Sequence, residues 1–269
     1  MISVIITSYN YSQYIKDTIQ SVIDQTYNDW ELIIIDDCSK DNSVDIIKTF
    51  NDKRIKLIIN EQNLGLTKSI KIGIEKASGN WIAFLESDDF WAKNYLEEKI
   101  KIIKTSQESA VIFNNVEMFG NIDKINYFNK KYPTKFFDNK KFPKNMFFDI
   151  TTKNRLLTLS AVCIKKDLFS NFNFNVKDDR FFDWWLLIHV ARKNKFYYIP
   201  QKLTFWRLHK NSYVNKKDKN IKLPTNMLAY FDIFIKEKDL ISLLLAAYIL
   251  FRTIIKKYLF KIFEKNKKY

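Results

Sequence analysis

The sequence predicts an α/β fold with a doubly wound, mostly parallel sheet in a single main domain, followed by a C-terminal helical extension. Over the first hundred residues, apolar runs rich in β-branched residues alternate with amphipathic stretches. This alternation indicates strands joined by crossover helices, which pack back over the sheet and leave the strands parallel. Hydrophobic residues make up 46% of the 269 residues, enough for a large buried core.

The first half contains four strand-like runs. The expected strands are Ile2–Thr7, Glu31–Asp36, Ile55–Ile59 and Trp81–Leu85. The first is a continuous β-branched run, typical of a strand that is buried on both faces. Helices are expected after Ser12, which can cap the first of them, and at 42–50, 66–77 and 92–105. Gly79 is expected just beyond the third helix as its terminator.

The second half is less regular. A strand is expected at 110–116, a loop-rich stretch up to Lys141, and a further strand at 160–164. An apolar helix is expected at 180–192, and two short strands at 196–199 and 203–208, separated by Pro200. The absence of repeats and low-complexity linkers favours one domain, with halves 1–105 and 106–210 and an extension at 211–269.

The formal net charge of +15 is unevenly distributed. Residues 1–105 carry a net charge of −3, residues 106–206 carry +8 and residues 207–269 carry +10. Lysine outnumbers arginine 39 to 6, whereas nucleic-acid sites favour the planar fork of arginine. No nucleic-acid partner is therefore expected.

The cysteine content and the N-terminus suggest a reducing compartment. Two cysteines without a paired motif exclude a disulfide framework and a zinc site. The first residues, MISVIITSYN, have neither a basic stretch nor a small-residue cleavage site of a secretory signal. We expect a cytoplasmic location.

Polar clusters follow three of the predicted strands, at 7–10, 36–41 and 86–89. Ligands of open α/β sheets bind at the carboxyl ends of the strands. Carboxylates that converge there repel one another unless a cation lies between them, and Mg²⁺ or Mn²⁺ carrying a diphosphate fits such oxygen ligands. The sequence has neither GxxxxGK[ST] nor GxGxxG, so we expect metal and side chains to hold a nucleotide.

The order of these motifs resembles family 2 of the inverting glycosyltransferases, whose fold is of the GT-A type. The matching segments are TSYN at 7–10, DDxSxD at 36–41, NLG at 63–65, ESDD at 86–89, FDWWL at 182–186 and WRLH at 206–209. Each motif alone is weak, but their order and spacing over residues 1–210 are specific. The resemblance implies a single catalytic domain, with a nucleotide-sugar-binding half at 1–105 and an acceptor-binding, catalytic half at 106–210.

The resemblance also implies roles for particular residues. Thr7 and Tyr9 would line the pocket for the nucleotide base, and Asp37 or its neighbour Asp36 would accept a hydrogen bond from the uracil imide. Glu86 would contact the ribose, and Asp88 would bind Mn²⁺ or Mg²⁺. Asp183 would be the catalytic base. The chain departs from the family pattern at two positions. Glu86 replaces the usual first aspartate of the DxD motif, and Phe182 stands where a glutamate commonly precedes the base.

Four further residues are candidates for contact with the diphosphate or the acceptor. They are Asp89, Trp91, Arg207 and His209. Asp89 could instead cap the helix that follows, and Trp91 could stack on a sugar or pack beneath that helix. The mid-helix His189 is interpreted as a core residue, and Cys38 is assigned no chemistry.

The C-terminal segment combines an apolar run with positive charge. Residues 240–251 are too few to cross a bilayer, and the residues after them interleave lysines with apolar side chains. This pattern favours a helix at an anionic membrane surface, with packing on the domain or on a partner subunit as the alternative. Whether the chain forms a homo-oligomer stays open.

These observations predict a metal-dependent, inverting glycosyltransferase. The expected donor is a nucleotide sugar, most simply a UDP-sugar, and the expected acceptor is a glycan or lipid-linked glycan in bacterial surface polysaccharide synthesis. The enzyme would sit peripherally on the inner face of the cell membrane. The alternatives are a sugar nucleotidyltransferase, disfavoured because TSYNYSQY is not a Gly-rich basic loop, and a non-catalytic nucleotide-sugar or glycan-binding module.

Overall fold

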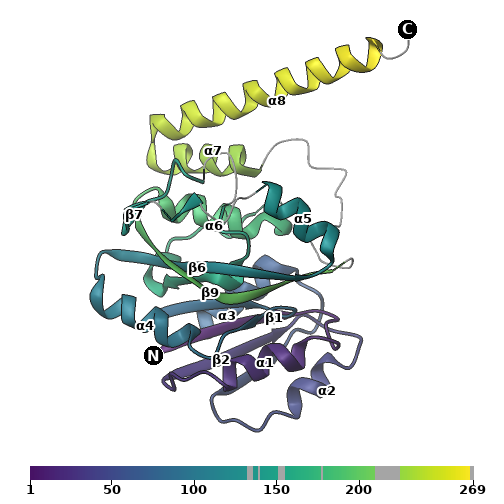
Figure 1. Ribbon diagram of the computed structural model, residues 1–269, viewed down its shortest axis with the longest axis vertical. Coiled ribbons are helices and arrows are strands. Elements are labelled where there is room, and N and C mark those ends of the chain that lie inside the picture. Colours follow the sequence, from purple (N-terminus) through teal and green to yellow (C-terminus); the bar gives the residue numbers. More distant parts are fainter. Residues whose placement is uncertain (132–135, 139, 151–154, 177, 210–224, 267–269) are drawn as a thin grey trace.

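The computed structural model describes residues 1–131, 136–138, 140–150, 155–176, 178–209 and 225–266. Its centre is a mixed sheet with the strand order β3-β2-β1-β4-β8-β6-β9-β5, and β7 pairs with β9. Helices cover both faces of this sheet, and two long C-terminal helices lie beyond it (Figure 1). The expected fold class, a mostly parallel α/β sheet with a helical extension, is confirmed.

The first half follows the predicted order. Its strands are β1 (Ile2–Ser8), β2 (Trp30–Asp36), β3 (Ile55–Ile59) and β4 (Trp81–Glu86), and its helices are α1 (Ile15–Ile23), α2 (Ser43–Lys48), α3 (Leu66–Lys76) and α4 (Tyr95–Thr105). β1 lies in the middle of this group and pairs in parallel with β2 and β4. Burial on both faces explains why these strands read as continuous apolar runs.

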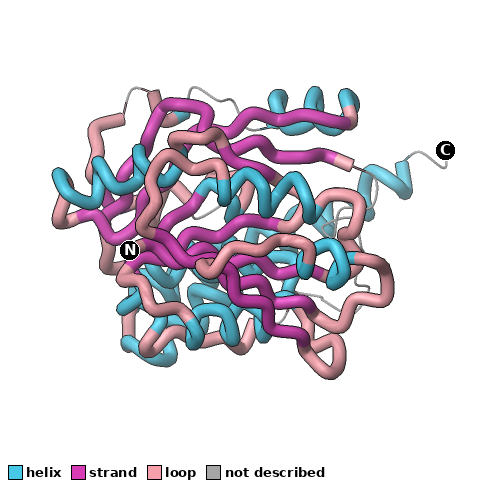
Figure 2. The backbone as a smooth tube through the Cα atoms, turned by 90° about the horizontal axis from the view of Figure 1, so that it is seen from below, coloured by secondary structure: helices cyan, strands magenta, loops and turns pink. Residues whose placement is uncertain are grey.

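Two hydrophobic cores form because alternate residues of each strand point to opposite faces of the sheet. Val4 and Ile6 of β1 pack with α1, α2 and α4 on one face. Ile5 packs with α3, α6 and α7 on the other face. Seen from below in Figure 2, the strands run through the molecule with helices on either side.

The second half departs from the sequence predictions in two places. Its strands are β6 (Ser109–Gly120), β7 (Lys144–Asn145), β8 (Val162–Lys165) and β9 (Lys195–Leu208), and it includes α5 (Ile122–Lys131). The short strand β5 (Phe90–Trp91) belongs to the first half but pairs with β9. β9 is one strand and not two, because register shifts against β6 leave Pro200 between paired residues. α5 occupies part of the stretch that was expected to be loop-rich.

Three expected helix boundaries were wrong. α1 begins after Tyr14, and the Ser12 backbone N–H donates to Asp41 instead of leading into the helix. α4 begins after Asn94, so Asp89 does not cap it. Gly79 does not terminate α3. A Cβ there would lie 2.8 Å from the Ser3 backbone nitrogen, so this glycine permits close packing of two backbones.

The C-terminal part is a stack of three helices, α6 (Phe182–Ala191), α7 (Thr225–Glu237) and α8 (Leu240–Asn266). α6 lies between the sheet and α7, and α8 packs on α7 and extends beyond it (Figure 1). Most side chains of α6 are apolar on whichever side they lie, because the sheet covers one side of this helix and α7 covers the other. Among the described residues, no helix combines the length and the apolar character needed to cross a membrane.

Candidate active site

The sheet register brings the predicted polar clusters together. Thr7 near the end of β1 pairs with Glu86 at the end of β4, and Ser8 pairs with Asp36 at the end of β2. The strands are parallel, so their carboxyl ends share one edge of the sheet. Residues nearly eighty positions apart in the chain therefore meet at this edge.

The loop Glu86–Asp89, which we call the acidic loop, concentrates negative charge. Carboxylate oxygens of Glu86, Asp88 and Asp89 lie within 4.8 Å of one another. Burial, followed by the charges of Asp88 and Asp183, raises the pKa of Glu86 to about 8. Burial and the charges of Asp88 and Glu86 likewise raise the pKa of Asp89 well above its ordinary value. A cation at this loop would relieve both the burial cost and the repulsion.

Asp89 is the structural member of the acidic loop. It is 1% exposed and accepts hydrogen bonds from the Ser160 hydroxyl at 2.7 Å and from the Arg207 backbone N–H at 2.9 Å. The Ser160 hydroxyl oxygen also accepts from the Glu86 backbone N–H at 2.9 Å. Thr158 donates to Glu86. Asp89 thus joins the acidic loop to the second half of the chain instead of facing a ligand.

Asp88 has a different environment, because its carboxylate meets an imidazole. His209 Nε2 lies 2.8 Å from Asp88 Oδ2, just beyond the end of β9. Arg207 Nε donates to the Asp88 carbonyl at 2.9 Å, and the Arg207 guanidinium lies over the Tyr14 ring. The side chains of Asp88 and His209 are 12% and 14% exposed, so both are reached from the sheet edge. The structure brings these two predicted residues into one pair.

Asp183 lies in the first turn of α6. It is close enough to Glu86 that its charge contributes to the raised pKa of Glu86. The Trp184 backbone N–H donates to Asp183 Oδ1 at 2.7 Å. The Trp185 indole N–H donates to the Asn173 carbonyl and anchors the helix, so Asp183 is carried by a largely buried helix.

The nucleotide side of the edge is ordered by two carboxylates. Asp36 accepts from both the backbone N–H and the hydroxyl of Ser39. Asp37 accepts from the backbone N–H groups of Leu64 and Gly65 at 2.8 and 2.9 Å, which ties the NLG motif to the end of β2. Gly65 is required there, since its φ is +87° and a Cβ would lie 2.6 Å from Asp179 Oδ2.

The two residues predicted for the base pocket lie beside these carboxylates. Thr7 is half-buried, and Tyr9 is 39% exposed at the same sheet edge. An exposed aromatic ring next to a half-buried hydroxyl suits a base that stacks on one face.

The candidate Trp91 has a packing role, and so has His189, which was interpreted as a core residue. Trp91 is 3% exposed, stacks on Tyr95 with ring centroids 3.8 Å apart, and donates its indole N–H to the Ser160 carbonyl. It therefore offers no free ring face to a sugar. His189 bridges the Trp185 carbonyl and Asp232, which joins α6 to α7 and fits the core interpretation.

Several residues that shape the site were not predicted from the sequence. Tyr11 and Tyr14 flank the His209 ring, and burial together with the acidic loop raises the pKa of Tyr11. Thr158 and Ser160 hold the acidic loop from some seventy residues away. Tyr11 lies directly after the TSYN motif, which was a usable signal. The positions of Thr158 and Ser160 along the chain gave no signal of their contact with the acidic loop.

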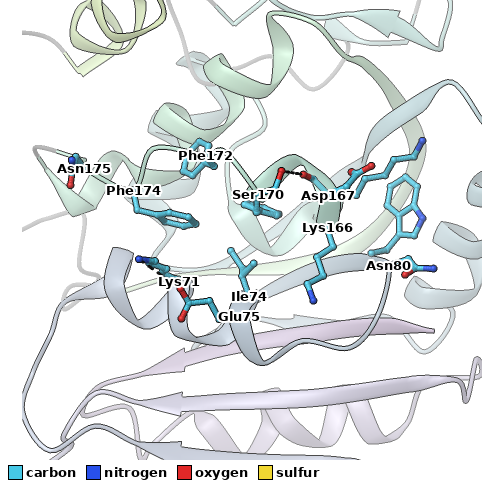
Figure 3. Close-up of a pocket in the computed structure, with 13 residues that line it drawn as sticks. Lys71, Ile74, Glu75, Asn80, Lys166, Asp167, Ser170, Phe172, Phe174 and Asn175 are labelled. Atoms are coloured by element: carbon cyan, nitrogen blue, oxygen red, sulfur yellow. Dashed lines mark hydrogen bonds and ion pairs between the residues drawn. The ribbon is translucent and has the colours of Figure 1, made fainter. Parts of the chain in front are cut away.

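A groove of about 940 Å³ lies away from the acidic loop. Its lining residues include Lys71 and Glu75 on α3, Trp81 at the start of β4, and Phe172 and Phe174 (Figure 3). Trp81 begins the strand that Glu86 ends, so this groove is at the opposite edge of the sheet. It takes no part in the arrangement around Asp88 and Asp183.

The mixed sheet and the acidic loop at its carboxyl edge define a glycosyltransferase fold of the GT-A type. The sequence profile of glycosyl transferase family 2 matches residues 3–162, and the chain belongs to this family. This confirms the resemblance found in the sequence.

Relatives and solved structures agree with this assignment. Over 234 residues the chain is 32% identical to the Escherichia coli protein WfgD, named a UDP-Glc:alpha-D-GlcNAc-diphosphoundecaprenol beta-1,3-glucosyltransferase, covering 86% of each chain. It is 29% identical over 229 residues to TuaG of Bacillus subtilis, a putative teichuronic acid biosynthesis glycosyltransferase, covering 82% of this chain and 84% of TuaG. The crystal structure of S. aureus TarS 1–349 with UDP-GlcNAc superposes with a TM-score of 0.64 at 18% identity, covering 87% of this chain and 66% of that one.

Proposed function

We propose that this glycosyltransferase is a metal-dependent, inverting enzyme that moves a sugar from a UDP-sugar to a lipid-linked glycan in bacterial surface polysaccharide synthesis. It would act at the inner face of the cell membrane. The observation that carries the proposal is that the Asp88–His209 pair and Glu86 lie at the edge where β1, β2 and β4 end, near enough to Asp183 for its charge to act on Glu86. Asp183 would serve as the base, and the acidic loop would hold the counter-charge for the leaving group.

The donor would lie along the ends of β1 and β2. Tyr9 and Thr7 would offer a ring face and a hydroxyl to the base. Asp37 is 5% exposed and already accepts from the Asn60 side-chain amide and from two backbone N–H groups of the NLG motif, and it would accept one further hydrogen bond from the uracil imide. The ribose would meet Glu86, whose extra methylene relative to aspartate extends its reach. A UDP-sugar is supported by the donor named for WfgD and by the UDP-GlcNAc bound in the TarS complex.

Mn²⁺ or Mg²⁺ fits the residues that are present. Asp88 provides an accessible carboxylate, His209 an imidazole nitrogen next to it, and Glu86 a further carboxylate within 4.8 Å of Asp88. Burial and the neighbouring carboxylates raise the pKa of Glu86, and a bound cation would offset that repulsion. When bound, the cation would supply counter-charge to the diphosphate leaving group.

The chain's own residues account for the remaining chemistry. Asp183 accepts the proton of the acceptor hydroxyl as that oxygen attacks the anomeric carbon. Phe182 has no proton-accepting group, so of these two neighbouring positions only Asp183 would serve as base. Attack from one face and departure from the other break one bond as the other forms, which inverts the anomeric configuration.

A lipid-linked acceptor is supported by two independent features. WfgD, which aligns with 86% of this chain, is named for an acceptor linked to diphosphoundecaprenol. The C-terminal segment of this chain is apolar and strongly basic, as a protein working at an anionic membrane requires.

The direct test is thermal unfolding in the presence of UDP, GDP or CMP, each with and without Mn²⁺. Stabilisation by UDP that depends on Mn²⁺ is expected, because the diphosphate and the acidic loop need a shared cation. Equal stabilisation by all three nucleotides, or none, would contradict the donor assignment. Turnover of a UDP-sugar then separates an enzyme from a non-catalytic binding module.

A further inference from the structure

The C-terminal helix α8 exposes a continuous apolar stripe. Its members recur every three or four residues and are each 45% to 62% exposed: Leu240, Ile241, Leu244, Tyr248 and Phe251. Residues three and four apart lie on one face of a helix, so these side chains form a single stripe.

The opposite face of α8 is already used for packing. Ser242, Ala246 and Ile249 are buried on the side toward α7. Asp239, just before the helix, accepts two hydrogen bonds from the Arg192 guanidinium, at 2.8 and 2.7 Å. The orientation of α8 is thus fixed, and the stripe points away from the body of the protein.

α8 is longer than α7, the helix on which it packs. α8 has 27 residues and α7 has 13, which correspond to lengths of about 40 and 20 Å. Both views show α8 continuing past the rest of the molecule toward the C-terminus (Figures 1 and 2). In the sequence, Ile255, Tyr258, Leu259 and Ile262 repeat the spacing of the stripe.

Positive charge accompanies the stripe. Residues 252–268 contain seven basic residues and one acidic residue, Glu264. A stripe of apolar residues flanked by lysines is the pattern of helices that lie in the interface of an anionic bilayer. A second copy of this chain would bring the same positive segment against it, and like charges oppose that contact.

We propose that the α8 stripe is a docking surface for an anionic lipid bilayer, on which the helix lies parallel to the membrane plane. The inference rests on the proposed function only for its purpose, delivery of a lipid-linked acceptor. α8 packs on α7, and α7 packs on α6, whose first turn carries Asp183. The bilayer would therefore be held at a fixed orientation to the helix that bears Asp183.

The test uses the full chain, because Asp239, Ala246 and Ile249 are part of the packing and a truncated α8 would lose them. The stripe variant is Leu244→Glu with Tyr248→Glu, which are 61% and 51% exposed. The matched control is Ile122→Glu with Tyr127→Glu on α5, which are 64% and 56% exposed.

Sedimentation with vesicles of phosphatidylglycerol and phosphatidylcholine measures the partition coefficient. The unchanged protein should bind these vesicles, bind pure phosphatidylcholine less, and lose affinity as salt rises. The stripe variant should partition at least about tenfold less, and the α5 control should stay within about twofold of the unchanged protein. If the double variant fails to fold, Phe251→Glu alone provides the same comparison at a position that is 62% exposed.

Two results would overturn the inference. One is equal vesicle binding by the stripe variant and the α5 control, or no binding by the unchanged protein. The other is a dimer in light scattering that the stripe variant dissociates, which would make a second copy the occupant. UDP-sugar hydrolysis measured on the same samples keeps the two proposals apart: hydrolysis without vesicle binding counts against the docking surface alone, and vesicle binding without hydrolysis counts against the proposed function alone.

Discussion

The two halves of this molecule differ in the contacts that stabilise each of them. In the first half, β1 to β4 are parallel and alternate with helices along the chain, and β1 pairs with both β2 and β4. In the second half, β9 passes Pro200 within a single strand. The end of α6 contacts the C-terminal helices through the Arg192–Asp239 ion pair and the His189–Asp232 hydrogen bond. The candidate site lies where the halves meet, with Asp88 from the first and Asp183 and His209 from the second.

The largest effect is expected at Asp88, in the first half. Asp88→Ala removes the accessible carboxylate of the acidic loop, so sugar transfer should fall by more than about 10⁴-fold and UDP binding should lose its dependence on Mn²⁺. Asp45→Ala on α2 is the matched control at an exposed aspartate. Transfer assays and UDP titrations measure both effects. Unchanged turnover in Asp88→Ala would exclude the metal assignment.

The next largest effect is expected at Asp183, in the second half. Asp183→Asn keeps the shape of the side chain but cannot accept a proton, so kcat should fall by roughly 10²–10⁴-fold while UDP affinity stays the same. The two variants should differ in UDP binding: it should lose its dependence on Mn²⁺ in Asp88→Ala and stay unchanged in Asp183→Asn. Loss of UDP binding in Asp183→Asn would place this residue in the donor site instead.

A smaller effect, on stability, is expected from removing the ion pair between Arg192 and Asp239 in the second half. Arg192→Met removes a paired contact with Asp239, whose side chain is 9% exposed, and should lower the free energy of unfolding by about 2 kcal/mol. Lys16→Met on α1 is the exposed control. Thermal unfolding measures both, and equal midpoints would show that this pair does not hold the C-terminal helices.

The same pair has a pH signature. The Arg192 contact lowers the pKa of Asp239 to about 2, so its contribution is complete above the unfolded value near 4 and is lost as the pH falls toward 2. The stability gap between the unchanged protein and Arg192→Met should therefore narrow between about pH 4 and pH 2. A gap that is constant over this interval would mean that the pair contributes no pH-dependent stability.

The smallest effect is expected at Lys99, which is fully buried between α4 and the sheet. Its ammonium donates to Asn114 Oδ1 and to the carbonyls of Ile112 and Ala161, yet burial lowers its pKa to about 7. Between pH 7 and the unfolded value near 10.5 the unfolded chain binds more protons, so stability should rise with pH. Relative to Lys99→Met, we expect a gain of about 1 kcal/mol on raising the pH from 7 to 8.5. Lys104→Met on the exposed side of α4 should show no such slope.

The elements of the first half could be predicted because local pattern determines them. The limits of β3 match the prediction, and β1, β2 and β4 differ from it by one residue at an end. The boundaries that failed depend on distant contacts. Ser12 bonds to Asp41 and Gly79 packs on Ser3, and neither partner is visible in a local window.

The candidate site could be predicted in part for the same reason. Strand ends placed Asp36, Asp37 and the acidic loop at one edge, and the motif order supplied Asp183. The sequence did not reveal the different environments of Asp88 and Asp89. They depend on His209 and Ser160, which lie far along the chain in the second half.

Direct, inverting transfer from a UDP-sugar at this edge can be tested by the anomer that is released first from the donor. Time-resolved proton NMR of UDP-glucose, whose glucose is α-linked, incubated with the protein and Mn²⁺ reads that anomer before mutarotation. We expect β-glucose first, together with loss of the signal in Asp183→Asn. Initial release of α-glucose, or an undiminished signal in Asp183→Asn, would contradict it.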